Sequence, residues 1–195
     1  MVEYGRATAP AATMDRNVLG VLLLCASDLV LFALLIVAYL VFHGRGSGPD
    51  AATVLNLPRT AAFSVCLWAS SGTIWVASRQ LARDDRRGCL LAVLATVALG
   101  AAFFVGQILE WSGLVQQGVT LGTNLFGTTF FTLTGLHGLH VVVGLVMWLV
   151  VAGFIWSGDV TAQRSSGLEA PAIFWHFVDA VWVVLFGLVY LGARL

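Results

Sequence analysis

Residues 174–182 read FWHFVDAVW, and this stretch decides the fold because it sets two ionisable side chains inside a membrane-spanning pattern. His176 and Asp179 lie three residues apart in a run of about 20 or more mostly apolar residues, which is long enough to cross a bilayer. Ionisable groups in hydrocarbon are costly, so they rarely occur there without a partner or a role. The stretch therefore predicts a transmembrane helix that carries a polar site.

The composition of the whole chain agrees with this interpretation. Of its 195 residues, 59% are hydrophobic and only 10% are charged, against about 25% charged in soluble domains. Each crossing needs about 20 mostly apolar residues. The pattern predicts an all-α polytopic membrane protein, a five-helix transmembrane bundle with spans near 17–42, 58–81, 88–113, 124–156 and 170–194.

The polar segment 1–16 is predicted to be an N-terminal tail, followed by one transmembrane domain over 17–195. All ten basic residues are arginine, and the side of the N-terminus receives Arg6, Arg16, Arg79, Arg83, Arg86, Arg87 and Arg164. The other side receives Arg45, Arg59 and Arg194. Basic residues favour the cytoplasmic side, so the N-terminus is predicted to be cytoplasmic and the C-terminus periplasmic or extracellular. The net charge of zero gives no indication of nucleic-acid binding.

Two further polar positions interrupt apolar spans at a similar depth. Asp28 lies roughly 16 Å into the first span, and His137 and His140 lie near the middle of the fourth, taking about 1.5 Å per residue. A carboxylate in low dielectric requires a compensating neighbour to remain ionised. We therefore predict that Asp28 is buried and pairs with His137 or His140. The alternative is that these polar groups only hold helices together.

The last span is predicted to turn its ionisable face towards the same cluster. His176 and Asp179 share one helix face, and Trp175 and Trp182 share a neighbouring one. An ionisable face is expected to point into the bundle and a bulky aromatic face towards lipid or a partner subunit. All five ionisable residues would then form a single buried polar network.

Gln107 and Glu110 form a secondary polar pair near the outer end of the third span. Glu110 is interpreted as a solvated or loop-bonded carboxylate at that depth. The three cysteines are isolated, without CxxC or CxxH spacing, so no metal site or disulfide framework is predicted. No catalytic residue is predicted either.

These motifs together resemble subunit III of the haem–copper respiratory oxidases, the cytochrome c oxidase subunit 3 family. The match rests on SDLVLF at 27–32, GQILEW at 106–111, TGLHGLHV at 134–141 and FWHFVDAVW at 174–182. The sequence departs from the family in having five spans, as in the short bacterial form, where the mitochondrial type has seven. Asp28 also stands where the family usually has glutamate.

The resemblance implies a non-catalytic subunit that carries neither haem nor copper. Those cofactors are expected in the partner subunits I and II of a proton-pumping complex, with direct contact to subunit I. Its implied role is to support complex stability, proton uptake and oxygen access to subunit I. The implied location is the bacterial inner membrane, where bound phospholipid is also expected.

Three alternatives remain at this point. The motifs barely separate a cytochrome c oxidase subunit from subunit III of a quinol oxidase, or from the accessory protein associated with nitric oxide reductase. A proton-coupled transporter would use the Asp and His cluster differently. The chain shows no inverted repeat and no pair of broken helices, which are the usual signs of a transport site.

Overall fold

The computed structural model describes residues 15–42, 51–159 and 166–192. Within these ranges the chain forms α1 (Arg16–Phe42), α2 (Ala51–Val54), α3 (Leu57–Ala82), α4 (Arg86–Gln116), α5 (Leu125–Ser157), α6 (Ser166–Phe186) and a π-helical turn, η2 (Gly187–Leu191). Five helices there are long and apolar enough to cross a membrane, and the described residues contain no strand. The all-α, five-helix fold class is therefore confirmed. Most of the predicted tail, residues 1–14, lies outside the described ranges.

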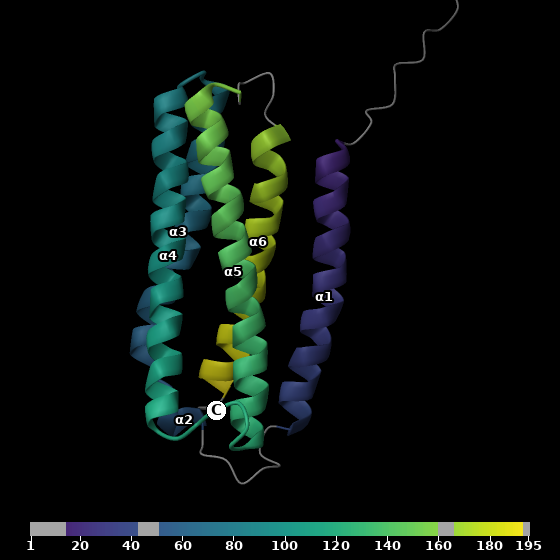
Figure 1. The fold of residues 1–195 in the computed structure, drawn as a ribbon, viewed down its shortest axis with the longest axis vertical. Helices are drawn as coiled ribbons and strands as arrows, with labels where there is room; N and C mark the ends of the chain where they lie inside the picture. Colours follow the sequence, from purple (N-terminus) through teal and green to yellow (C-terminus); the bar gives the residue numbers. More distant parts are fainter. Residues whose placement is uncertain (1–14, 43–50, 160–165, 193–195) are drawn as a thin grey trace, which may run out of the picture.

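The long helices stand roughly side by side, with α1 at one edge of the bundle (Figure 1). The closest packing is between α3 and α4, and α4 also packs on α5. Helix α1 packs against α5 and α6 and leaves most of its circumference exposed. Its buried stripe consists of Cys25, Asp28, Phe32 and Tyr39, which share one helix face.

The helix ends follow local signals in the sequence. Asn124 caps α5, because its side chain accepts a hydrogen bond from the backbone N–H of Gly127 at 2.6 Å. Helix α6 begins four residues before the predicted start at 170. Pro171 lies in the second turn, and the acidic Glu169 occupies the first, where it complements the helix dipole.

Arg86 joins two helices at the charged end of the bundle. From the first turn of α4, its guanidinium donates to the carbonyl oxygens of Ile155 and Trp156 in the last turn of α5. Helix C-termini present carbonyl groups without helical partners and a partial negative charge, which an arginine side chain satisfies. The α4–α5 pair is thereby fixed at this end.

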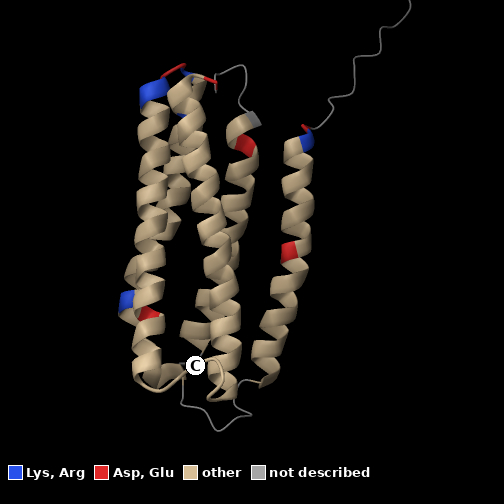
Figure 2. Ribbon diagram, viewed as in Figure 1, with Lys and Arg blue, Asp and Glu red and all other residues tan. Residues whose placement is uncertain are grey.

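Figure 2 shows charged positions towards the two ends of the bundle and an acidic position midway along α1. Asp28 and Asp179 lie in the interiors of α1 and α6. Of the arginines that the structure describes, Arg16, Arg79, Arg83, Arg86 and Arg87 belong to the end where α1 starts. Arg59 belongs to the opposite end, in the first turn of α3. The asymmetry used to predict orientation is thus present among the described residues.

The rotation of α6 differs from the prediction. Trp175 and Trp182 are fully buried, and their indole N–H groups donate to Ser70 and Ser64 of α3, each at 2.9 Å. His176 is exposed instead. The predicted outward aromatic face is therefore wrong, since the buried hydroxyls of α3 satisfy the indoles inside the bundle. The predicted inward ionisable face is wrong for His176, whereas Asp179 turns inward to Ser71 of α3.

Glycines on two other helices make room for one of these rings. A Cβ at Gly144 of α5 would lie 2.5 Å from the Trp175 ring, and one at Gly100 of α4 would lie 2.7 Å from it. Real Cβ atoms do not approach so closely. These small residues therefore receive an aromatic side chain, which sets the rotation of α6.

Candidate functional site: two separate ionisable pairs

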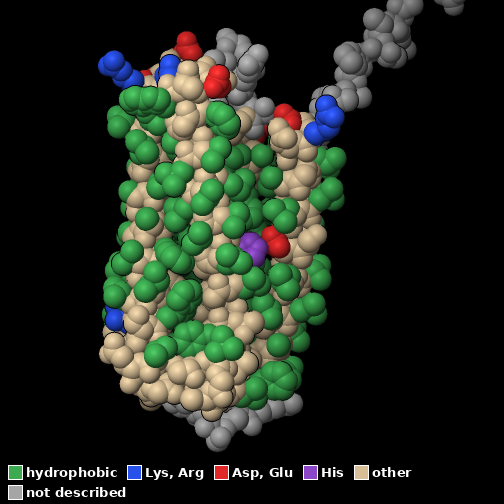
Figure 3. Space-filling view, viewed as in Figure 1, with side chains coloured by type: hydrophobic (Ala, Val, Ile, Leu, Met, Phe, Trp, Pro, Cys, Tyr) green, Lys and Arg blue, Asp and Glu red, His purple; other side chains and the backbone are tan. Residues whose placement is uncertain are grey.

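A carboxylate and an imidazole meet midway along the bundle, between α1 and α5. Asp28 Oδ2 lies 3.3 Å from His140 Nε2, and the two side chains are only 12% and 13% exposed. Figure 3 shows a histidine and an acidic side chain adjacent on this face, surrounded by apolar atoms. The prediction that Asp28 is buried and pairs with one of the two histidines of α5 is confirmed, and the partner is His140.

The second nitrogen of His140 fixes the tautomer of its neutral ring. His140 Nδ1 lies 2.8 Å from the carbonyl oxygen of Leu136, which can only accept, so Nδ1 carries a hydrogen. In the neutral ring, Nε2 therefore presents a lone pair to Asp28, and an acid and a base face each other at this contact.

His137 does not join this pair. Both of its ring nitrogens are buried, and neither has a hydrogen-bond partner among the described residues. Its ring stacks on Trp182 at 4.9 Å and meets Phe103 edge-on at 6.0 Å. Burial in an aromatic enclosure disfavours the charged imidazolium, so His137 acts here as a packed ring.

His176 and Asp179 form a second site with α3. Ser71 Oγ donates to Asp179 Oδ2 at 2.6 Å, and His176 Nδ1 lies 3.1 Å from the same hydroxyl. Asp28 and His140 form a separate pair between α1 and α5. The prediction of a single buried network is therefore wrong, because the buried tryptophans turn this face of α6 towards Ser71.

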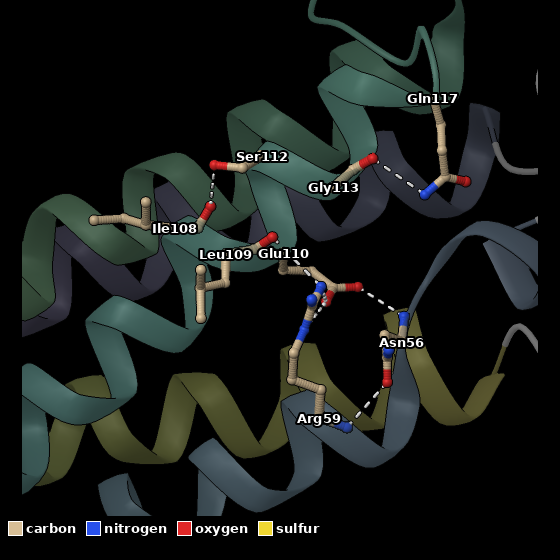
Figure 4. A network of polar contacts seen from close by, with 8 residues as sticks. All are labelled: Asn56, Arg59, Ile108, Leu109, Glu110, Ser112, Gly113 and Gln117. Carbon is tan, nitrogen blue, oxygen red and sulfur yellow. Dashed lines mark hydrogen bonds and ion pairs between the residues drawn. The ribbon is translucent and has the colours of Figure 1, made fainter.

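Gln107 and Glu110, the secondary polar pair, have different surroundings. Glu110 is only 1% exposed, and it binds Arg59 of α3 through an Nη2–Oε2 contact of 2.5 Å (Figure 4). Its other oxygen accepts the backbone N–H of Asn56 at 2.8 Å, in the turn before α3. Of the two predicted alternatives, the loop-bonded carboxylate is found and the solvated one is wrong, while the arginine partner was missed. The Gln107 amide is buried without a hydrogen-bond partner among the described residues.

Comparison with known proteins agrees with this architecture. The family model of cytochrome c oxidase subunit III matches residues 6–193. The chain is 36% identical over 185 residues to cytochrome c oxidase subunit 3 of Thermostichus vulcanus, covering 92% of this chain and 89% of that protein. The chain belongs to the cytochrome c oxidase subunit III family.

Relatives in this subunit III family carry two kinds of name. A cytochrome bo(3) ubiquinol oxidase subunit 3 of Pseudomonas aeruginosa is 35% identical, with 92% of this chain and 86% of that protein covered. A quinol oxidase subunit 3 of Bacillus spizizenii is 32% identical, with 97% and 95% covered. Both kinds of relative are oxidase subunits, and neither the nitric oxide reductase nor the transporter alternative is favoured.

The ligands needed for a redox metal do not converge in the described part of this subunit III chain. No three His, Cys, Asp or Glu side chains come together there. His140 is engaged with Asp28 and Leu136, and His137 is enclosed by aromatic rings. The expectation that haem and copper belong to partner subunits remains a prediction.

Sequence reasoning missed three residues that complete these sites. Ser71 bridges His176 and Asp179, and Arg59 neutralises Glu110. Ser70 accepts from a buried indole. The serines belong to an Ala-Ser-Ser-Gly run over 69–72 that looks like ordinary small-residue packing, and their partners lie more than a hundred residues away. No local signal in the sequence identifies such partners.

Proposed function

We propose that this chain is the non-catalytic subunit III of a haem–copper terminal oxidase of the aerobic respiratory chain. The observation that carries the proposal is the subunit III family match over residues 6–193, in a chain with five membrane-spanning helices. Relatives at 31–36% identity are named as subunit 3 of cytochrome c oxidases and quinol oxidases. This chain then belongs to an oxidoreductase complex and leaves the redox chemistry to partner subunits I and II, which hold the haem and copper.

The proposed location is a bacterial inner membrane. Five of the six described arginines belong to the end of the bundle where α1 starts, and basic residues favour the cytoplasmic side. The start of α1 is then cytoplasmic, and the end of η2 is periplasmic. Large apolar side chains remain exposed along α1, for example Leu23 at 62% and Leu34 at 65%, and they need phospholipid tails or subunit I as neighbours.

The Asp28–His140 pair supports a role in proton uptake to the pumping subunit. The pair brings an acid and a base within 3.3 Å of each other midway along the bundle and is partly open to the outside between α1 and α5. A partly accessible acid–base pair of this kind can exchange a proton with a neighbouring water chain. In this proposal, the pair helps to maintain proton supply during sustained turnover, and the bundle also supports the assembly of subunit I and oxygen access to it.

Purification of the tagged chain from native membranes in a mild detergent tests the proposal. We expect two larger polypeptides to co-purify in fixed proportion, with a reduced-minus-oxidised spectrum of haem. If the chain instead co-purifies with a soluble substrate-binding protein or migrates alone without haem, it is not an oxidase subunit.

The electron donor requires a separate assay. Relatives of nearly equal identity are named as cytochrome c and as ubiquinol oxidase subunits, so this chain does not distinguish the two donors. Oxygen consumption by the purified complex with reduced cytochrome c assigns it to the cytochrome c oxidases, whereas consumption with ubiquinol alone assigns the complex to the quinol oxidases.

A further inference from the structure

A groove between α3 and α6 reaches an ionisable group inside the membrane-spanning region. Its volume is about 450 Å³, and its wall includes Ser78, Glu169 and His176. A water molecule needs about 10–15 Å³ and polar partners, and here the volume is sufficient and the three named side chains supply the polar groups, while the other five lining residues are apolar. It begins at the last turn of α3 and the first turn of α6, at the charged end of the bundle, and ends beside His176. Water from that end can therefore reach the imidazole.

The hydrogen bonds of Ser71 beside the groove have defined donors and acceptors. Ser71 has a single hydroxyl proton, which it donates to Asp179 Oδ2 at 2.6 Å. The 3.1 Å contact between Ser71 Oγ and His176 Nδ1 therefore needs the imidazole to donate. The neutral histidine is then protonated on Nδ1, and its Nε2 retains a lone pair.

Asp179 is suited to accept a proton. Its Oδ1 is buried and has no hydrogen-bond partner among the described residues. A carboxylate that is partly withdrawn from water and satisfied on only one oxygen is unfavourable, and protonation removes that charge. His176 is exposed, so the acceptor lies inside the bundle and the entry point lies at its surface.

We propose that His176, Ser71 and Asp179 form a proton relay that takes one proton from water in the α3–α6 groove and stores it on Asp179. A proton from water binds His176 Nε2. The Nδ1 proton passes to Ser71 Oγ as the hydroxyl proton of Ser71 passes to Asp179 Oδ2. The histidine ends neutral with its proton on Nε2, and the serine hydroxyl now donates to Nδ1. The aspartic acid donates to Ser71 Oγ, so the group has gained one proton and lost its negative charge.

The order of the three residues distinguishes this group from a hydrolytic triad. In such a triad the histidine lies between the serine and the acid, and it removes the serine proton. Here Ser71 lies between His176 and Asp179, and its proton is already donated to the carboxylate. The serine therefore conducts a proton and is not activated as a nucleophile.

The other ionisable groups that the described parts of α1, α3 and α5 bring to α6 have their own neighbours. On α1 and α5, Asp28 and His140 are bound to each other, and His137 stacks on Trp182. On α3, Arg79 lies over the ring of Trp75 at 3.5 Å. On α6 itself, Glu169 belongs to the first turn and lines the groove seven residues before His176. The relay is a property of α3 and α6 alone, so it can be tested without the oxidase complex.

Nitrogen-15 NMR of the histidine-labelled full chain in lipid bilayers tests the relay directly. The chain has four histidines, and His176 is assigned by the signal lost in His176→Gln. We expect the Nδ1–H tautomer at alkaline pH and a neutral Nε2–H tautomer after the first proton is taken up. His140 is an internal control, because its Nδ1 is bound to the Leu136 carbonyl and remains protonated throughout. Conversion of His176 directly to an imidazolium with both nitrogens protonated would overturn the relay.

Variants of the bridging serine and of the acceptor separate the relay from simple packing. Ser71→Ala removes the bridge and should abolish the tautomer change, whereas Ser71→Thr keeps a hydroxyl and should retain it. If Ser71→Ala does not fold, Asp179→Asn serves the same purpose, because an amide cannot store the proton. A tautomer change that persists in Asp179→Asn or Ser71→Ala would contradict the proposed route.

Cysteine accessibility tests the entry of water. Ala172→Cys places a thiol in the groove, and Val183→Cys places one on an exposed apolar face of the same helix. Thiols react as thiolates, which form in water, so we expect a charged, membrane-impermeant thiol reagent to modify Ala172→Cys more than about tenfold faster. The unsubstituted chain measures the background from its own cysteines. Equal rates at the two positions would exclude a water-filled groove.

Discussion

The ring of Trp175 lies directly against the backbone of Gly144, where a Cβ would be only 2.5 Å from the indole. This relationship determines which face of α6 looks into the bundle. With Trp175 inside, the neighbouring His176 is left at the surface beside Ser71. The second ionisable site is therefore a consequence of where one aromatic side chain fits.

Gly144→Ala is expected to destabilise the bundle by about 1–3 kcal/mol, the usual cost of overpacking a core. The added methyl group must displace the Trp175 ring, which is enclosed on all sides. The free energy of unfolding in mixed detergent micelles measures this cost. Gly153→Ala, on the same helix, is the matched control, because a Cβ added at Gly153 would have no neighbouring atom within 4 Å. A stability loss in the control equal to that in Gly144→Ala would contradict the packing argument.

Arg59→Met is expected to lower the free energy of unfolding by about 1–3 kcal/mol. It leaves the Glu110 carboxylate, 1% exposed, without its cation. We place the cost below the about 3–5 kcal/mol of a fully buried pair because the Arg59 side chain is 35% exposed. Adding Glu110→Gln should recover part of the loss, since the amide oxygen can still accept from Asn56. A double variant whose loss equals the sum of two independent losses would show that the pair is not coupled.

Asp28→Asn is expected to shorten the productive life of the assembled oxidase while leaving its initial oxygen consumption largely intact. The substitution removes the carboxylic acid of the pair with His140, while the redox centres of the proposed complex belong to subunits I and II. Continuous oxygen-electrode recording distinguishes the initial rate from its decay. Asp15→Asn, an exposed position at the start of α1, is the control. Complete loss of the first turnovers in a haem-replete Asp28→Asn complex would assign Asp28 a catalytic role.

The five helices could be predicted because each crossing requires its own long apolar run, which is visible without knowledge of its neighbours. The Asp28–His140 pair could be predicted for a similar reason. The two residues lie at one depth, and a lone acid in hydrocarbon needs a partner.

The contacts of His176 could not be predicted, because depth and spacing do not fix the rotation of a helix about its axis. That rotation depends on Gly100 and Gly144, which accommodate Trp175, and on serines of α3 that accept the indole N–H groups. The Arg59–Glu110 ion pair was missed for a related reason. Arg59 was counted only as a flanking charge, although the turn before α3 brings it to a carboxylate 51 residues away.

Selective removal of this chain from the purified complex tests the central claim most directly. After a stronger detergent has stripped the chain, haem content and initial oxygen consumption are measured in both fractions. We predict that the remaining complex retains its haem and its initial rate, loses activity faster during turnover, and that the released chain shows no haem absorbance. Haem that leaves with this chain, or an oxidase that loses its first turnovers without it, would contradict the assignment to a non-catalytic subunit III.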